Sequence, residues 1–271
     1  MKVYEDGMPE YLMAWIQEQH VFWVASAPLS VDGHVNLSTK GLRGTFHIVN
    51  SKKVWYEDMA GSGSETISHV RENGRITILF NAFEGPPRIA RLHGKGTVCE
   101  FGTPQYNELL PPSDRHPGSR SIIVVDVERV STSCGYTVPF YEFRGHRDDT
   151  YYKIAETLEK SDLTAQDEIP EKAVPEKGLR EYLSTVNSKS IDGLPAITVA
   201  QEANRGPLNP MLGTFPRIKP TSTPETRDTL GKAGMVMQIV DVRFLVGIFM
   251  GLLLAILYSR VGVALVSVKA E

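Results

Sequence analysis

The sequence lacks the features that mark several common classes of protein. Its 271 residues carry a net charge of only −3 and no long run of Lys or Arg, so a nucleic-acid partner is not expected. The only two cysteines, Cys99 and Cys134, are far apart, and the 7 histidines are scattered. Neither set has the short spacings of metal ligands, so no metal is predicted and the cysteines are expected to be reduced thiols.

Well-known catalytic motifs and a secretory leader are also missing. The chain contains no GxSxG, no phosphate-binding P-loop and no GxGxxG, which argues against an α/β-hydrolase, a P-loop NTPase and a dinucleotide-binding Rossmann domain. The first residues, MKVYEDGMPEYLMAW, include acidic side chains and no apolar run. They do not predict a signal peptide, so the bulk of the chain and its thiols are expected to face the cytosol.

A long apolar run does occur near the C-terminus. Residues 244–259 carry no charge, and with residues 261–266 the run reaches the roughly 20 residues that span a bilayer. Arg260 lies close enough to the end to reach the interface, and Gly247 and Gly251 have the spacing of a helix-pairing motif. We expect a single transmembrane helix over residues 241–268, with Arg243 on the cytosolic side. The alternative is a buried amphipathic helix or a helix in a dimer core.

The first half of the chain has the pattern of short strands separated by turns. Strands are predicted over residues 21–27, 35–38, 46–49, 53–58, 75–80, 88–99 and 121–130, and a hairpin turn is expected at Asp32-Gly33. Helices are predicted over residues 9–19 and 65–73, the second with Ser64 as N-cap and Gly74 at its end. Gly94 and Gly96, both within a predicted strand, indicate a bulge or a corner of a curved sheet. This succession favours a closed or nearly closed β-barrel.

The character of the chain changes after residue 150. Helices are predicted over residues 150–159 and 179–187, whereas residues 161–178 are acidic and proline-rich, as in a linker. Residues 193–225 have many prolines and glycines and little periodicity, so an extended tether is expected. The predicted organisation is a barrel domain at 1–150, a helix and linker region at 151–240, and the transmembrane helix at 241–268.

Three blocks within residues 10–145 then point to a family. VASAPLSVDGHVNLSTKG at 24–41, GSGSETISHVRENGRITILF at 61–80 and GPPRIARLHG at 85–94 are together similar to the pyridoxamine 5'-phosphate oxidase-like split-barrel family. The resemblance implies a mainly β fold, a six-stranded split β-barrel with short helices, that forms a homodimer with FMN in the cleft between subunits. It also implies flavin contacts from one strand and phosphate contacts from the start of a helix, at Asn36, Ser38 and Lys40 and at Ser64, Glu65 and Thr66 respectively.

The phosphate position departs from the family pattern. The well-studied oxidase has an Arg-Lys pair where this chain has Glu65 and Thr66. A helix start and two hydroxyl groups favour phosphate, but a carboxylate beside it is repelled. Three alternatives follow: Arg88 and Arg91 supply the compensating charge, Glu65 points away, or the ligand is not FMN but haem or another flavin.

The functional prediction is an FMN-dependent oxidoreductase without a specified substrate or catalytic residue. The alternative is a non-catalytic split-barrel module that dimerises or binds a ligand at a membrane. The oxidase's C-terminal Arg/His substrate motif has no clear counterpart, since residues 143–147 (FRGHR) carry suitable side chains in a different context. Pyridoxal phosphate synthesis is therefore not predicted.

Overall fold

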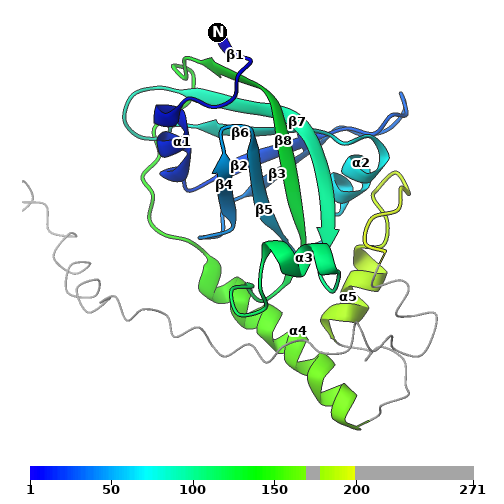
Figure 1. Ribbon diagram of the computed structural model, residues 1–271. Helices are drawn as coiled ribbons and strands as arrows, with labels where there is room; N and C mark the ends of the chain where they lie inside the picture. Colours follow the sequence, from blue (N-terminus) through cyan, green and yellow to red (C-terminus); the bar gives the residue numbers. More distant parts are fainter. Residues whose placement is uncertain (169–177, 199–271) are drawn as a thin grey trace, which may run out of the picture. The chain divides into compact units, whose positions relative to one another are not determined.

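A computed structural model describes residues 1–168 and 178–198 and shows a curved antiparallel sheet with short helices around it (Figure 1). The sheet has eight strands in the order β3-β2-β6-β7-β8-β5-β4, and β1 pairs with β8. The strands are β1 (Lys2–Tyr4), β2 (Phe22–Ser26), β3 (Asn36–Lys40), β4 (Phe46–Asn50), β5 (Lys53–Met59), β6 (Arg75–Asn81), β7 (Ile89–Glu100) and β8 (Ser119–Ser133).

Five helices accompany the sheet within the described part of the chain. They are α1 (Glu10–Gln17), α2 (Glu65–Asn73), α3 (Pro104–Leu109), α4 (Asp148–Glu168) and α5 (Leu179–Val186). Helices α4 and α5 lie side by side (Figure 1). In the described ranges, no helix combines the length and the apolar character that crossing a membrane requires. The predicted transmembrane helix at 241–268 lies outside the described residues.

The core forms because each strand alternates apolar and polar side chains. In β2, Phe22 and Val24 face inward and are buried, whereas Trp23 between them is half-buried on the other face. Helix α1 covers one end of this core with Leu12 and Ile16, which are fully buried at helical spacing. One continuous apolar cluster therefore fills the sheet's interior.

The sheet curls without pairing its two end strands, β3 and β4. Aromatic rings pack across the opening: the ring of Phe46 on β4 lies 5.1 Å from that of Phe22 on β2 and 5.1 Å from that of Phe80 on β6. This arrangement is consistent with the predicted split barrel. The count of six strands that the family resemblance implied is wrong, because the described residues contain eight, seven of which correspond to the strands predicted from the sequence pattern. The strand missing from the sequence prediction, β1, is only 3 residues long and too short to show an alternating pattern.

Helix α2 confirms one sequence prediction in detail and corrects another. It begins at Glu65 and ends at Asn73, and Gly74 follows in the left-handed conformation with φ 72°. That conformation favours glycine and closes the helix, as predicted. Ser64, however, makes no side-chain capping hydrogen bond to the helix. Its hydroxyl group is used elsewhere, as described below.

The predicted bulge lies in β7, where the register shifts between His93 and Gly94. A Cβ atom at Gly94 would sit 2.0 Å from the carbonyl oxygen of Asp126. We expect Gly94→Ala to lower the free energy of unfolding by about 1–3 kcal/mol, because the backbones of β7 and β8 must separate. Urea unfolding measures the difference. The control is Gly61→Ala, where a Cβ would meet nothing within 4 Å; an equal loss in both variants would contradict this account.

The region after residue 150 is more ordered than its composition indicates. Helix α4 continues to Glu168, so the predicted linker at 161–178 is helical over its first part. Residues 193–198 do not form a free tether either, because Ala196 and Ile197 are buried in the core cluster. Two apolar residues are too few to produce a recognisable period in a sequence. Residues 169–177 and 199–225 of the predicted linker and tether lie outside the described residues.

Candidate functional site

Strand β3 places three polar side chains in a row on the inner face of the sheet. Asn36, Ser38 and Lys40, here called the polar row, are half-buried and lie opposite buried residues of β2. Leu37 and Thr39 between them are exposed on the outer face. Because β3 is an end strand of the sheet, one side of the row is not covered by another strand. The row is thus held in the fold and also open to a ligand.

Hydrogen bonds connect the polar row to helix α2. The side-chain amide of Asn36 donates to the hydroxyl oxygens of Ser26 at 3.1 Å and Thr66 at 3.0 Å. Ser38 in turn donates to Asn36 Oδ1 at 3.1 Å. On the far side, Ser26 Oγ lies 3.0 Å from Nδ1 of His69, whose pKa is lowered by burial. The network fixes the polar row against the first turn of α2.

The end of the polar row meets a buried charged group. Lys40 Nζ donates to Asp58 Oδ1 at 2.7 Å, and Arg120 Nε donates to Asp58 Oδ2 at 2.8 Å. The side chains of Asp58 and Arg120 are almost completely buried, whereas that of Lys40 is 20% exposed. Burial alone would raise the pKa of Asp58, but the charges of Arg120 and Lys40 outweigh burial and lower it to about 2.

This group has one carboxylate and two cations, and so carries one excess positive charge. Arg120 also holds the loop before α2, donating to the carbonyl oxygens of Gly61 at 3.3 Å and Gly63 at 2.7 Å. The side chain of Asn187 donates to the same Gly61 oxygen at 2.7 Å. The positive group therefore positions the loop that leads into the helix, and Lys40 is its one partly exposed member.

Residues 187–198, here called the strap, cover the start of α2. Ser64 Oγ donates to the carbonyl oxygen of Lys189 at 2.8 Å. Glu65 Oε1 accepts from the backbone N–H of Ile191 at 3.3 Å, and Ser68 Oγ donates to the carbonyl oxygen of Leu194 at 3.1 Å. The side chains of Ser64 and Glu65 are therefore engaged by the chain itself. Of the three predicted phosphate contacts, only Thr66 joins the polar row.

The strap is also fixed at its end, Thr198, and in its middle, at Asp192. Near residue 198, the backbone N–H and the hydroxyl group of Thr198 donate to Glu100 Oε1, each at 2.9 Å. At the tip, Asp192 accepts from the backbone N–H of His34 at 2.8 Å, and its other carboxylate oxygen lies 2.7 Å from His34 Nδ1. The hydrogen bonds to His34 lower the pKa of Asp192. The strap thus links the β2–β3 turn, α2 and β7.

Arg88 and Arg91 do not join the polar row. The guanidinium of Arg88 lies over the rings of Tyr11 and Trp15, which both belong to α1. Its central carbon is 5.5 Å from the centre of the Tyr11 ring and 5.2 Å from the centre of the Trp15 ring. Arg91 lies opposite Leu79, which lies opposite Trp23 on the outer face of the sheet. Because directly paired residues share a face, Arg91 and the polar row lie on opposite faces. The compensating charge that the sequence analysis assigned to Arg88 and Arg91 therefore stays a prediction, because within one chain neither arginine lies beside the polar row.

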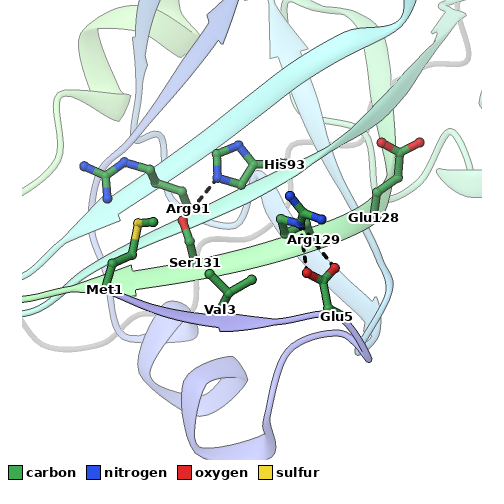
Figure 2. Close-up of a pocket in the computed structure, with 8 residues that line it drawn as sticks. All are labelled: Met1, Val3, Glu5, Arg91, His93, Glu128, Arg129 and Ser131. Atoms are coloured by element: carbon green, nitrogen blue, oxygen red, sulfur yellow. Dashed lines mark hydrogen bonds and ion pairs between the residues drawn. The ribbon is translucent and has the colours of Figure 1, made fainter.

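Arg91 instead lines a hollow of about 700 Å³ on the outer face, next to β1 (Figure 2). There His93 lies 3.1 Å from the hydroxyl of Ser131, and Arg129 pairs with Glu5 at 3.1 Å. Burial lowers the pKa of His93, and the charges of Arg91 and Arg129 lower it further. This histidine is therefore neutral near pH 7, and the charged side chains that line the hollow are two arginines and two glutamates, Arg91, Arg129, Glu5 and Glu128.

Sequence reasoning missed Asp58, Arg120 and Asn187. The available signal was that Asp58 follows the apolar and aromatic residues 54–56 on one predicted strand and that Arg120 lies two positions before the apolar run at 122–125 in β8. Charged residues in such places are buried only when paired. Their pairing across 62 positions is a property of the fold and has no local pattern.

Comparison with known proteins gives a consistent family assignment. A family model described as pyridoxamine 5'-phosphate oxidase matches residues 8–134. The pyridoxamine 5'-phosphate oxidase family protein ustO of Aspergillus flavus is 34% identical over 200 residues, which cover 73% of this chain and 78% of that protein.

Among solved structures, similarity is weaker. A HupZ variant from Group A Streptococcus is 19% identical, with a TM-score of 0.39 over 46% of this chain and 98% of that one. A pyridoxamine 5'-phosphate oxidase-related, FMN binding protein from Nostoc punctiforme is 12% identical, with a TM-score of 0.35 over 48% of this chain and 85% of that one.

Proposed function

The chain belongs to the pyridoxamine 5'-phosphate oxidase family, and from this premise we propose that it binds FMN at the polar row and acts as an oxidoreductase. The observation that carries the proposal is the excess positive charge of Lys40 and Arg120 over Asp58 at the end of a row of hydrogen-bonding side chains. A phosphate needs both charge and donors, and this donor set provides them. Bound FMN supplies the electron-carrying ring, and the protein supplies binding and orientation.

The residues divide this work according to their burial. Lys40 is partly exposed and offers its ammonium group to an anion, while Arg120 stays buried and holds Asp58 and the loop. Asn36, Ser38 and Thr66 provide amide and hydroxyl groups whose orientation is already set by their mutual hydrogen bonds. Glu65 turns its carboxylate to Ile191 of the strap, which supports the alternative that it points away from the ligand.

The proposal is tested by incubating the purified full-length chain with FMN and removing unbound flavin by dialysis. We expect a yellow protein with close to one flavin per chain. A colourless protein after this treatment would contradict the proposal.

One observation favours a second candidate function, a non-catalytic binding or dimerisation module. The strap engages Ser64 and Glu65, which are two of the residues assigned to phosphate binding in this fold. Such a protein keeps the barrel fold, but the side chains that would bind the phosphate are occupied by hydrogen bonds to the strap. Retention of the fold without any flavin uptake would favour this function over the first.

We further propose that the protein is a homodimer. The family assignment supports this, as do the exposed apolar side chains Val35 and Leu37 beside the polar row, which are 77% and 67% exposed. Apolar side chains gathered beside a site are typical of a contact surface. Sedimentation equilibrium of the full-length chain is expected to give twice the monomer mass of 30.1 kDa.

Residues 241–268 are proposed to anchor the chain in a membrane, with the barrel in the cytosol. The support is the uncharged run at 244–259 in the sequence. After carbonate extraction of cell membranes, the full-length chain is expected to stay in the pellet, whereas a chain ending at residue 240 is expected to be released. Release of both chains alike would contradict the anchor.

A further inference from the structure

A groove of about 920 Å³ lies beyond the polar row, and no part of the proposed flavin site uses it except Lys40. It runs between the C-terminal end of α1, the ends of β3 and β6, and residues 141–147, here called the aromatic segment. Its volume falls in the range of roughly 300–1,000 Å³ that is typical of small-molecule sites.

The aromatic segment gives the groove a wall of ring surfaces. The Phe143 ring stacks on the His20 ring, with centroids 3.7 Å apart and planes 15° apart. The Tyr141 ring meets the Phe83 ring edge to face at 5.2 Å. Trp15 also lines the groove. Stacked and edge-on rings of this kind bind flat aromatic molecules, because a ligand ring can add to the stack.

The aromatic segment is not helical or extended, and side chains and backbone fasten it to the barrel. The backbone N–H of Phe143 donates to Glu84 Oε1 at 3.2 Å, and Nδ1 of His146 lies 2.9 Å from the carbonyl oxygen of Gly41. The backbone N–H of Tyr141 donates to the carbonyl oxygen of Phe83 at 3.3 Å. The wall is therefore formed in the free protein.

Asn81, which lines the groove, has a side-chain donor without a partner among the residues that the structure describes. Its side chain is buried, with 7% of the residue exposed, and lines the groove. Within the described ranges, its amide nitrogen Nδ2 has no hydrogen-bond partner. A buried unpaired donor is unfavourable, and a ligand oxygen that accepts from it removes that penalty. This donor distinguishes the groove from a merely apolar depression.

Charged side chains of both signs line the groove, so its charge alone does not select the ligand. The cations are Lys40 and Arg147, and the carboxylates are Glu18, Glu142 and Glu84, of which Glu84 already accepts from Phe143. We propose that this groove binds a planar aromatic molecule bearing a carbonyl or carboxylate oxygen, with the oxygen accepting from Asn81 Nδ2 and the ring packing on the aromatic wall. The site does not require flavin, so its occupancy is measured on the chain alone.

The test uses three probes with one ring system. Indole-3-carboxamide and indole-3-carboxylate both carry the oxygen, whereas 3-methylindole carries the ring without it. Calorimetry on the full-length chain without FMN is expected to give at least tenfold lower Kd values for the two oxygenated probes. Tighter carboxamide binding identifies a carbonyl ligand, and tighter carboxylate binding identifies an acid that also uses the rim cations. Equal Kd values for all three probes, or no binding, would overturn the proposal.

Two variants and one control locate the site. Asn81→Leu is expected to weaken both oxygenated probes at least tenfold and to leave 3-methylindole unchanged, while Phe143→Ala weakens all three. Asn107→Leu on α3, an exposed position outside the groove, is expected to change none. Because Asn81 Nδ2 is unpaired, Asn81→Leu should not lower the melting temperature. A lower melting temperature with unchanged probe binding would assign Asn81 a purely structural role and overturn the proposal.

Discussion

Replacing Arg120 by Met is expected to lower the free energy of unfolding by about 3–5 kcal/mol, the cost of leaving a buried charge without its main partner. Arg120 donates to Asp58 and to the carbonyl oxygens of Gly61 and Gly63. In the variant, Lys40 from the other side of the opening and the hydroxyl group of Ser121 at 3.5 Å remain beside the carboxylate of Asp58. Methionine preserves most of the side-chain volume, so urea unfolding reports the loss of charge and hydrogen bonds.

The matched control is Arg129→Met. Arg129 also pairs with a carboxylate, that of Glu5 at 3.1 Å, but its side chain is 60% exposed. Exposed pairs contribute about 0–1 kcal/mol, so this variant should unfold close to wild type. Equal stability of the Arg120 and Arg129 variants would mean that the buried group does not stabilise the fold.

The Arg120→Met variant should also unfold at a different pH on acidification. The pKa of Asp58 is lowered from 3.8 to about 2, so the charged form contributes stability that is fully present above about pH 4 and is lost as the pH falls through about 2. Without Arg120 the pKa of Asp58 rises, and this loss begins at higher pH. Acid unfolding followed by tryptophan fluorescence should therefore show a midpoint at higher pH in Arg120→Met. An unchanged midpoint would contradict the assignment.

Replacing Lys40 by Met is expected to raise the Kd for FMN about 10- to 100-fold, since a hydrogen bond to a charged group contributes about 1.5–3 kcal/mol. Lys40 is the partly exposed cation of the group, and Arg120 still neutralises Asp58 when Lys40 is removed. The variant should therefore fold, and the loss should appear in flavin binding. Fluorescence titration with FMN measures it.

Lys53→Met serves as the control for that titration. Lys53 also pairs with an aspartate, Asp126 at 3.0 Å, but its side chain is 44% exposed and lies on β5 away from the polar row. Its removal should leave the Kd for FMN unchanged. If Lys40→Met binds FMN as tightly as wild type does, the phosphate is not held by this cation.

Local patterns in the sequence predicted the local structure well. Helix α2 has the predicted bounds because Gly74 ends it, and the register shift after His93 coincides with Gly94. Both features depend on the conformational freedom of a single glycine, which a sequence displays directly. The strand predicted at 35–38 is present as β3, and its alternation places Asn36, Ser38 and Lys40 on the inner face.

The rest of the candidate site arises from contacts between distant parts of the chain. Ser64 has the residue type and position of an N-cap, yet its hydroxyl binds Lys189, which lies 125 positions away. Arg88 and Arg91 are close to the site in sequence, but strand pairing turns Arg91 to the opposite face of the sheet. A sequence shows which side chains carry charge, whereas the fold decides which of them meet.

The most direct test of the proposed site compares FMN with riboflavin, which has the same ring but lacks the phosphate. If the excess charge of the Lys40–Asp58–Arg120 group holds the phosphate, the wild-type full-length chain should bind FMN at least tenfold more tightly than riboflavin, and the difference should shrink as ionic strength rises. Equal Kd values for the two flavins at low salt would contradict the account.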